Sequence, residues 1–248
     1  ALTNKPKKLN NDAMEHKFYR VNYALEKVGC VPQVESVMKT PATPLVEFIG
    51  AWEVRSDKEV SSIVYPLIAR SARTKFTDVL SCYNFSGSGA IISERLKRLL
   101  NEYNFGCQHQ YTKVSIVTKK GEPISTPYYH LHLPMPGIVD KINYPKSVFY
   151  VKKFGERIND TPIEVKSFED DVRLQKITRK QDVSALILAE DIVLKKGTDL
   201  ELLDIFVFSG NSGGSRFMVS ERLKQRLEQE KITGITFEEY PYKISIDE

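Results

Sequence analysis

One pentapeptide, Ser-Glu-Arg-Leu-Lys, occurs twice in this chain, at residues 93–97 and again at residues 220–224. The two copies are 127 residues apart, about half of the 248-residue chain. Each copy lies between a strand-like segment that opens with an aspartate and a later glycine, which gives the pairs Asp78 and Gly106, and Asp204 and Gly234. This spacing is too long for a solenoid repeat. It predicts two related halves, each built from a strand, a glycine-containing loop, a helix and a further strand.

The first copy has the features of a helix start. Ser93 is a strong N-cap residue, because its hydroxyl accepts a hydrogen bond from a free N–H of the first turn. Glu94 suits the positive end of the helix dipole and is placed to pair with Arg98 one turn later. An apolar stripe follows at helical spacing, formed by Leu96, Leu99, Leu100 and Tyr103. Gly106 is expected to stop the helix.

The second helix is expected to begin at Ser220 and Glu221 in the same way. Its apolar stripe is thinner and consists of Leu223, Leu227 and Ile232, so this helix is expected to be the more exposed of the two.

Arg95 and Arg222 are not explained by helix formation, since a cation in the first turn opposes the helix dipole. Both halves nevertheless keep the arginine. We therefore expect each arginine to fold back onto a buried carboxylate or carbonyl cluster and to fix its helix on the sheet. Asp78 and Asp204, in the preceding strands, are the expected partners.

The remaining pattern predicts an α+β protein with mostly antiparallel sheet and about three helices, the two halves occupying residues 15–122 and 123–248 after a mobile tail at 1–14. Whether the halves form one domain or two is left open. Strands are expected at residues 18–25, 45–54, 79–85, 110–118, 128–133, 147–151, 185–189, 202–208 and 235–240. A short helix broken at Pro66 is expected over residues 60–75, residues 39–44 are a loop, and residues 168–179 fit either helix or strand.

Composition excludes several classes of function. The net charge is +4 with a pI near 8.8, but the signs are mixed along the chain rather than gathered into the basic patch of a nucleic-acid-binding protein. The three cysteines have no metal-ligand or redox spacing, which indicates a reducing compartment. No stretch approaches the ~18 apolar residues that span a bilayer. A cytoplasmic protein without nucleic-acid or membrane partners is expected.

Few residues point to catalysis. His130 and His132 lie on one face of a strand and are candidate metal ligands, with His109 or Asp140 as the nearest further donors. The simpler interpretation is two surface histidines on a solvated face, and no metal or other cofactor is expected. The glycine loops at 85–89 and 209–214 lack the ending of a phosphate-binding loop and are interpreted as flexible connections.

Two acidic clusters adjoin aromatic residues. Glu169, Asp170 and Asp171 follow Phe168, and Glu238 and Glu239 precede Tyr240. Such clusters are usually solvated, but an acidic surface with a neighbouring aromatic ring also suits a protein interface.

The repeat unit in the second half resembles a known family. Residues 203–206, a short glycine loop, residues 217–224 and residues 234–237 are similar to the C-terminal part of immunity proteins of bacterial polymorphic toxin systems. The similarity is to the branch that closes with an Ile/Val-Ser-Glu-Arg-Leu-Lys helix and a Thr-Gly-x-x-Phe strand. Residues 17–23 resemble the aromatic opening of such proteins, and residues 128–140 resemble their mid-chain strand and acidic turn.

This resemblance implies a cytoplasmic antidote that binds one cognate toxin domain and needs no catalytic residues. Loop aromatics expected to be exposed, Tyr144, Phe149 and Tyr242, are candidate interface residues. The chain departs from the acidic character of many nuclease-blocking members, which argues against a mechanism based on mimicking DNA. Two other functions stay open: an enzyme with a metal-assisted site at His130 and His132, and a scaffold that self-associates through sheet edges. The oligomeric state is left open.

Overall fold

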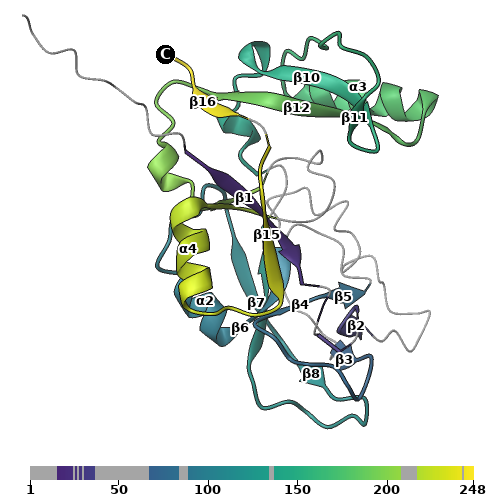
Figure 1. Ribbon diagram of the computed structural model, residues 1–248, viewed down its shortest axis with the longest axis vertical. Helices are drawn as coiled ribbons and strands as arrows, with labels where there is room; N and C mark the ends of the chain where they lie inside the picture. The colour runs from purple at the N-terminus through teal and green to yellow at the C-terminus, as the bar shows by residue number, and fades with distance from the viewer. Residues whose placement is uncertain are drawn as a thin grey trace, which may run out of the picture.

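The computed structural model describes residues 16–24, 26, 28–29, 31–36, 67–83, 89–133, 137–207, 217–241 and 243–248. Within these ranges, three α-helices accompany short strands that form four four-stranded sheets with mostly antiparallel pairing (Figure 1). The predicted α+β class is therefore confirmed.

Two of the sheets carry the two copies of the repeat, and their strand orders correspond. The first repeat sheet runs β4 (Val79–Leu80), β6 (Gly89–Ser93), β9 (Tyr128–His132), β7 (Gln110–Val114). The second repeat sheet runs β13 (Ile205–Phe206), β14 (Met218–Ser220), β1 (Phe18–Tyr23), β15 (Ile235–Glu239). All neighbours in both sheets are antiparallel.

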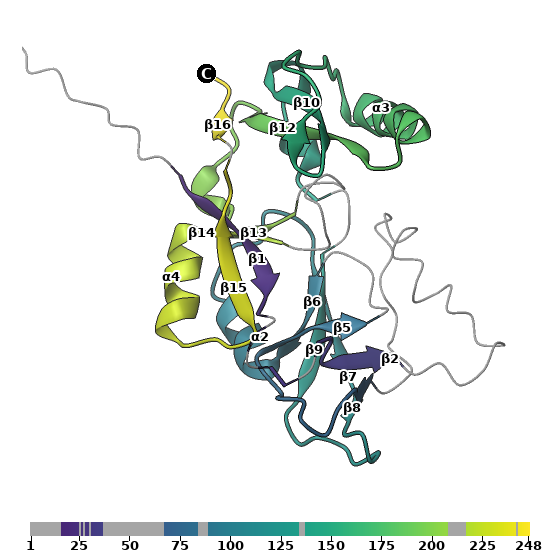
Figure 2. The same cartoon turned by 45° about the vertical axis from the view of Figure 1, so that its right-hand side comes forward.

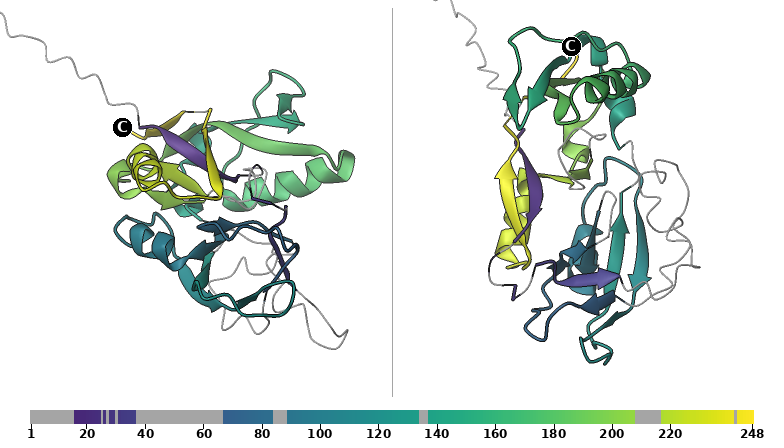
Figure 3. Two further views of the ribbon diagram at one scale, coloured as in Figure 1. Left: turned by 60° about the horizontal axis from the view of Figure 1, so that its bottom comes forward. Right: turned by 90° about the vertical axis from the view of Figure 1, so that its right-hand side faces the viewer.

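The third strand of each repeat sheet comes from the other half of the chain. β1 lies in the N-terminal half, yet it pairs with β14 and β15 of the C-terminal half. β9 lies in the C-terminal half, yet it pairs with β6 and β7 of the N-terminal half. Figures 1 and 3 show the result: purple β1 lies beside yellow β15, although the two are at opposite ends of the chain. Each half thus gives its first strand to the other half's sheet.

The repeat helices close a hydrophobic cluster that both halves share. α2 (Glu94–Leu100) buries Leu96, Leu99 and Leu100, and α4 (Glu221–Gln229) buries Leu223 and Leu227. All five leucines belong to one cluster, which also contains Tyr19 and Val21 from β1 and Leu131 from β9. Because burial of apolar surface drives folding, the exchanged strands and both helices stabilise a common core.

A third sheet covers the remaining face of the first repeat sheet. Its strands are β5 (Cys82–Tyr83), β2 (Val34–Ser36), β3 (Leu67–Ala69) and β8 (Ile116–Val117). Val34 and Leu67 from this sheet pack against Leu80, Ile91 and Tyr128. The first repeat sheet is thus covered on both faces.

The fourth sheet forms a separate layer at the top of Figure 1. It consists of β11 (Glu156–Arg157), β10 (Val148–Lys153), β12 (Ala185–Leu194) and β16 (Ile244–Ile246), and α3 (Phe168–Gln181) packs on β12. Short 3-10 turns η2 (Val139–Lys141), η3 (Tyr144–Lys146) and η4 (Leu200–Leu202) connect these elements. A second hydrophobic cluster, including Phe149, Ile187 and Leu194, joins this layer to β13 and β14 through Phe206 and Met218.

Three details of the sequence prediction need correction. The described part of the expected helix at 60–75 contains strand β3, because Leu67–Ala69 pairs with β2 and β8. The strand expected at 79–85 is interrupted at Ser81, whose backbone and hydroxyl bond to Gln33. Gly106 does not stop a helix: α2 already ends at Leu100. The segment at 168–179, which fitted two structures, is the helix α3.

Other expectations lie outside the described residues. These are the tail at 1–14, the loop at 39–44, the strand at 45–54 with Trp52, the glycine-loop residues 84–88 and 208–216, and the candidate Tyr242.

Candidate functional site

The second copy of the pentapeptide holds its helix through a buried aspartate. The second ion-pair cluster consists of Asp204, Ser220 and Arg222. The Ser220 hydroxyl accepts a hydrogen bond from Leu223 N at 3.3 Å and donates one to Asp204 Oδ1 at 2.7 Å. Arg222 binds both oxygens of the same carboxylate, with Nε 2.6 Å from Oδ1. The predicted N-cap and the predicted Arg222–Asp204 pair are both confirmed.

Asp204 is almost inaccessible, with 1% of its side chain exposed. Burial alone would raise the pKa of its carboxyl group. The hydrogen bonds from Arg222, Ser220 and the Asn104 N–H outweigh burial, and they lower the pKa below its usual value. The carboxylate therefore stays charged at neutral pH, and its fixed donors orient the start of α4.

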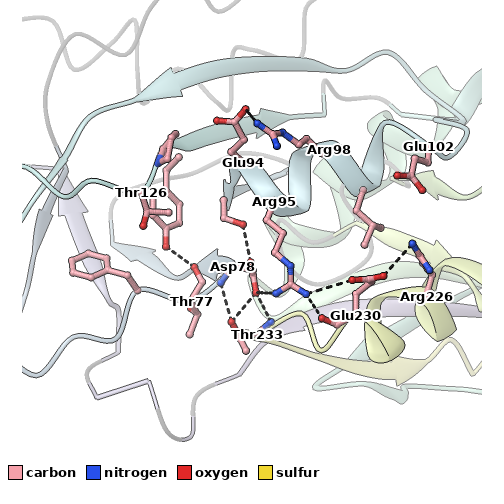
Figure 4. Close-up of a pocket in the computed structure, with 15 residues that line it drawn as sticks. Thr77, Asp78, Glu94, Arg95, Arg98, Glu102, Thr126, Arg226, Glu230 and Thr233 are labelled. Atoms are coloured by element: carbon pink, nitrogen blue, oxygen red, sulfur yellow. Dashed lines mark hydrogen bonds and ion pairs between the residues drawn. The ribbon is translucent and has the colours of Figure 1, made fainter.

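The first copy repeats this arrangement in a looser form. The first ion-pair cluster consists of Asp78, Ser93 and Arg95. Ser93 accepts from Leu96 N at 3.2 Å and donates to Asp78 Oδ1 at 2.8 Å. Arg95 NH1 lies 3.7 Å from Asp78 Oδ2, and its other terminal nitrogen donates to the carbonyl of Glu230, the C-cap residue of α4 (Figure 4). The expected pairing of Arg95 with Asp78 and with a carbonyl group is confirmed.

Each cluster is completed by the residue that follows the other copy's helix. Thr233, after α4, donates its N–H and its hydroxyl to Asp78 Oδ2 at 3.0 and 2.9 Å. Asn104, after α2, donates its N–H to Asp204 Oδ2 at 3.0 Å. The two copies therefore interlock through polar contacts as well as through their exchanged strands.

The pentapeptide lysines also have equivalent environments. Lys97 Nζ lies 3.9 Å from the ring centre of Tyr129 and 5.2 Å from that of Tyr111. Lys224 Nζ lies 4.9 Å from the ring centre of Tyr19 and 5.8 Å from that of Phe237. A cation over an aromatic face is attracted by the ring quadrupole, so each lysine fastens its helix to the exchanged strand of its sheet.

A groove of about 730 Å³ opens beside the first cluster, between the start of α2 and the end of α4 (Figure 4). Its charged lining is mixed in sign and is formed by Asp78, Glu94, Arg95, Arg98, Glu102, Arg226 and Glu230. Arg98 pairs with Glu94 at 3.0 Å, and Arg226 pairs with Glu230 at 3.1 Å. Since the Ser93 hydroxyl is engaged by Asp78 and Leu96, the groove presents paired charges and not an activated serine.

His130 and His132 are not surface residues, which corrects the sequence interpretation. They are 7% and 5% exposed because the third sheet covers the face that alternation assigned to solvent. Burial lowers the pKa of His130 to about 3, with a further contribution from His132, and burial also lowers the pKa of His132. Both imidazoles are therefore neutral at pH 7.

The expected further metal ligands do not join them. His109 is stacked on Phe105 with ring centres 3.6 Å apart, and Asp140 lies in η2. Across the described ranges, no group of three or more His, Cys, Asp or Glu side chains is arranged to hold a metal ion. The described cysteines, Cys82 and Cys107, are partly buried, and burial raises their pKa values to about 12 and about 11.

Most of the candidate interface residues are internal. Tyr144 and Phe149 are 6% and 3% exposed and stack on each other, so their expected exposure is wrong. Phe168 packs against the second hydrophobic cluster. The sequence interpretation placed Tyr144 and Phe149 in loops, but both fill the space between the fourth sheet and the second repeat sheet.

The acidic cluster at 169–171 forms the first turn of α3, where negative charge complements the helix dipole. Asp170 pairs with Arg173, which lowers the pKa of Asp170, and it also accepts from Lys166 N. Asp171 is 3% exposed. Only Glu169 is exposed, so the cluster stabilises a helix and does not form an acidic surface.

The sequence interpretation missed the most exposed large apolar side chains in the described ranges. These are Phe154, 87% exposed, and Val183, 85% exposed. The signal was present in the sequence, because Phe154-Gly155 stands between two strand-like segments where a hairpin turn normally carries a polar residue before glycine.

No protein-family model and no curated protein matches this chain. In the described part of the chain, no helix is long and apolar enough to cross a membrane.

Proposed function

We propose that this protein is an immunity protein, which binds a cognate bacterial toxin domain tightly and blocks its action. The observation that carries the proposal is the placement of the segments that resemble the family. The N-terminal segment 17–23 and the C-terminal segments 203–206, 217–224 and 234–237 are distant in sequence, yet they form one sheet, β13-β14-β1-β15, with α4 beside it. The resemblance therefore covers a complete structural unit.

The contacts of the pentapeptide support a scaffold role for that unit. Its serine caps the helix, its arginine binds an aspartate, its leucine enters the core and its lysine lies over aromatic rings. These contacts engage the serine, arginine and lysine of the motif within the protein, whereas Glu221 is exposed. Function would then belong to surfaces that the scaffold presents, as in a protein that acts by binding.

Charge supports a particular kind of partner. The chain carries +4 overall, so the toxin surface it meets is expected to be acidic or mixed in charge and not a site for nucleic acid. Complementary charge would speed association and exclude the wrong partners. A cytoplasmic site of action and the absence of a cofactor are part of the proposal.

The proposal is tested by rescue of growth. The gene adjacent to the one for this chain is expressed in a sensitive host, with and without this protein, and the two products are then co-purified. We expect killing by the neighbour, restored growth with this protein, and a stable complex. An unrelated toxin serves as the specificity control. A harmless neighbour, or killing that this protein does not relieve, would refute the immunity function and return attention to an enzyme or a self-associating scaffold.

A further inference from the structure

Exposed apolar side chains are frequent between residues 154 and 183, a stretch that contains the β10–β11 turn and α3. The described residues include eight exposed large hydrophobic side chains, and four of them fall between residues 154 and 183. These four are Phe154, Ile158, Ile177 and Val183. Scattered exposed apolar residues are normal, but a local concentration of them marks an interaction surface.

The two most exposed of these side chains lie at the same end of the sheet. Lys153, the last residue of β10, pairs with Ala185, the first residue of β12. Phe154 follows Lys153, and Val183 comes two residues before Ala185. The Lys153 ammonium also lies 2.7 Å from Asp182 Oδ2, which ties the hairpin to the end of α3. Phe154 and Val183 thus share one tip of the fourth sheet. This sheet and α3 form the top layer in Figures 1 and 2.

Phe154 occupies an unfavourable backbone position. It forms a two-residue turn with Gly155 between the paired residues Lys153 and Glu156, and both turn residues have positive φ, 53° and 92°. A turn of this kind prefers asparagine or glycine at the first position, because a bulky side chain is strained there. A phenylalanine at this place costs stability through its backbone and gains no burial. A phenylalanine at this position is explained if the ring is buried in a complex.

Two basic residues lie on one side of the tip, at the end of α3. Arg179 and Lys180 form the last turn of α3, beside Val183, and both are exposed. Neither has an ion-pair partner in the described ranges, whereas Asp182 is occupied by Lys153. That contact is the main cause of the lowered pKa of Asp182, so the carboxylate is ionised at neutral pH and pairs with Lys153. Glu156, which closes the turn, is also exposed, so the tip presents two apolar side chains beside two unpaired cations and one carboxylate.

We propose that this tip, formed by Phe154, Val183, Arg179 and Lys180, docks into an apolar pocket with an acidic rim on the cognate toxin domain. The inference rests on the proposed function, since it takes the toxin as the partner. The Phe154 ring fills the pocket, Val183 packs at its edge, and the two cations pair with carboxylates of the rim. Aromatic side chains with nearby arginine are typical of the few residues that dominate a protein interface.

The test uses the full chain and an inactivated form of the protein encoded by the adjacent gene. We expect Phe154→Asn to weaken binding by at least about tenfold, in the range for losing an interface anchor. The same variant is expected to melt no lower than the wild type, because asparagine suits the turn. Arg179→Gln with Lys180→Gln is expected to slow association and to reduce its salt dependence.

Two matched controls separate the tip from general effects. Leu202→Asn removes another exposed apolar side chain, 53% exposed, in η4. Lys119→Gln with Lys120→Gln removes two exposed cations from the turn after β8. Both controls are expected to bind like the wild type.

The outcomes are distinct. If the wild type binds the neighbour and Phe154→Asn binds equally well, the tip is not the docking surface, although the immunity function stands. If the wild type does not bind at all, the proposed function fails and the docking inference fails with it.

Loss of binding to anionic phospholipid vesicles in the Phe154→Asn variant, with toxin binding unchanged, would assign the tip to a membrane surface. Loss of concentration-dependent self-association, again with toxin binding unchanged, would assign it to a second copy of this chain.

Discussion

The two copies of the pentapeptide differ in how their arginine meets its aspartate. In the second cluster, Arg222 donates hydrogen bonds to both carboxylate oxygens of Asp204, whose side chain is 1% exposed. In the first, Arg95 lies 3.7 Å from Asp78, which is 11% exposed, and turns to the end of α4. The difference follows from the residue that comes after the opposite helix. Thr233 donates two hydrogen bonds to Asp78 Oδ2, whereas Asn104 donates one to Asp204 Oδ2. The same pentapeptide thus forms a two-oxygen ion pair with a buried aspartate in the second copy, and a looser ion pair beside a groove in the first.

The largest effect is expected from separating the copies. Residues 15–122 and 123–248, produced as two chains, each lack the third strand of their own repeat sheet, because β1 and β9 are exchanged. We expect neither half to fold alone and the mixture to form a one-to-one complex. Circular dichroism and amide hydrogen exchange of each half measure this. Native-like protection in an isolated half would show that the exchange is not essential.

The two glycines after the helices are expected to differ next. A Cβ at Gly234 would lie 2.1 Å from the Val79 carbonyl oxygen, and φ there is +89°. Gly234→Ala should therefore cost about 3 kcal/mol, from the left-handed backbone and the overpacking together. A Cβ at Gly106 would meet the flexible end of Leu203 at 2.5 Å. Gly106→Ala should cost less, and equal losses in urea unfolding would contradict the comparison.

The buried histidines predict a pH dependence that belongs to the first repeat sheet. His130 has Arg20 as its equivalent in the second repeat sheet, and Arg20 pairs with Glu238. The pKa of His130 is lowered to about 3 in the folded protein, whereas an unfolded histidine has a pKa of about 6.5. Below pH 6.5, the unfolded chain therefore binds a proton at His130 that the folded protein does not bind. Stability is then lost as pH falls from about 6.5 toward 3, by about 2 kcal/mol at pH 5.

Chemical denaturation between pH 7 and pH 5 measures that loss. His130→Gln is expected to be less stable at pH 7 but to show a shallower slope with pH, while Arg20→Gln should keep the slope of the wild type. An unchanged slope in His130→Gln would show that another group titrates.

The arginines give a smaller contrast. Arg222→Ala leaves the buried Asp204 carboxylate without its cation, although Ser220 and Asn104 still donate to it. We expect a loss of about 2 kcal/mol, between the values for exposed and buried ion pairs. Arg95→Ala should cost about 1 kcal/mol or less, because Arg95 lies 3.7 Å from a less buried carboxylate and Asp78 keeps its other donors. Melting temperatures in the reverse order would contradict this assignment.

The lysines should show the smallest difference. Lys97 lies nearer to its ring than Lys224, 3.9 against 4.9 Å. Lys97→Gln is expected to cost about 0.5–1 kcal/mol and Lys224→Gln somewhat less. A double-mutant cycle of Lys97 with Tyr129 isolates the interaction, and zero coupling would show that the two groups are merely adjacent.

Local features of the repeat were predictable from sequence. Ser93 and Ser220 identified the helix starts, and the first-turn arginines pointed to Asp78 and Asp204, because capping and charge placement act over a few residues or along one strand. The burial of His130 was not predictable, since alternation defines two faces but does not show that a third sheet covers one of them. The exchange of β1 was equally hidden, because nothing in residues 18–23 specifies a partner at the other end of the chain.

The exposed tip shows the opposite case. The sequence Phe154-Gly155 indicates a turn with an unusual first residue. The sequence interpretation instead predicts exposure for Tyr144 and Phe149, which lie in the second hydrophobic cluster. Loop position alone does not distinguish an aromatic residue that plugs a gap between layers from one that faces solvent.

The exchanged strands also have a consequence for synthesis. Phe18 pairs with Ser220, about 200 residues later, so β1 leaves the ribosome long before its partners exist. At about 5–20 residues per second, it waits roughly 10–40 s with both edges unpaired. The strands of the first repeat sheet are complete once His132 has been made, whereas the second repeat sheet cannot close until β15, near the end of the chain, has been made. A truncated or stalled chain would keep the edges of β1 unpaired, which favours aggregation.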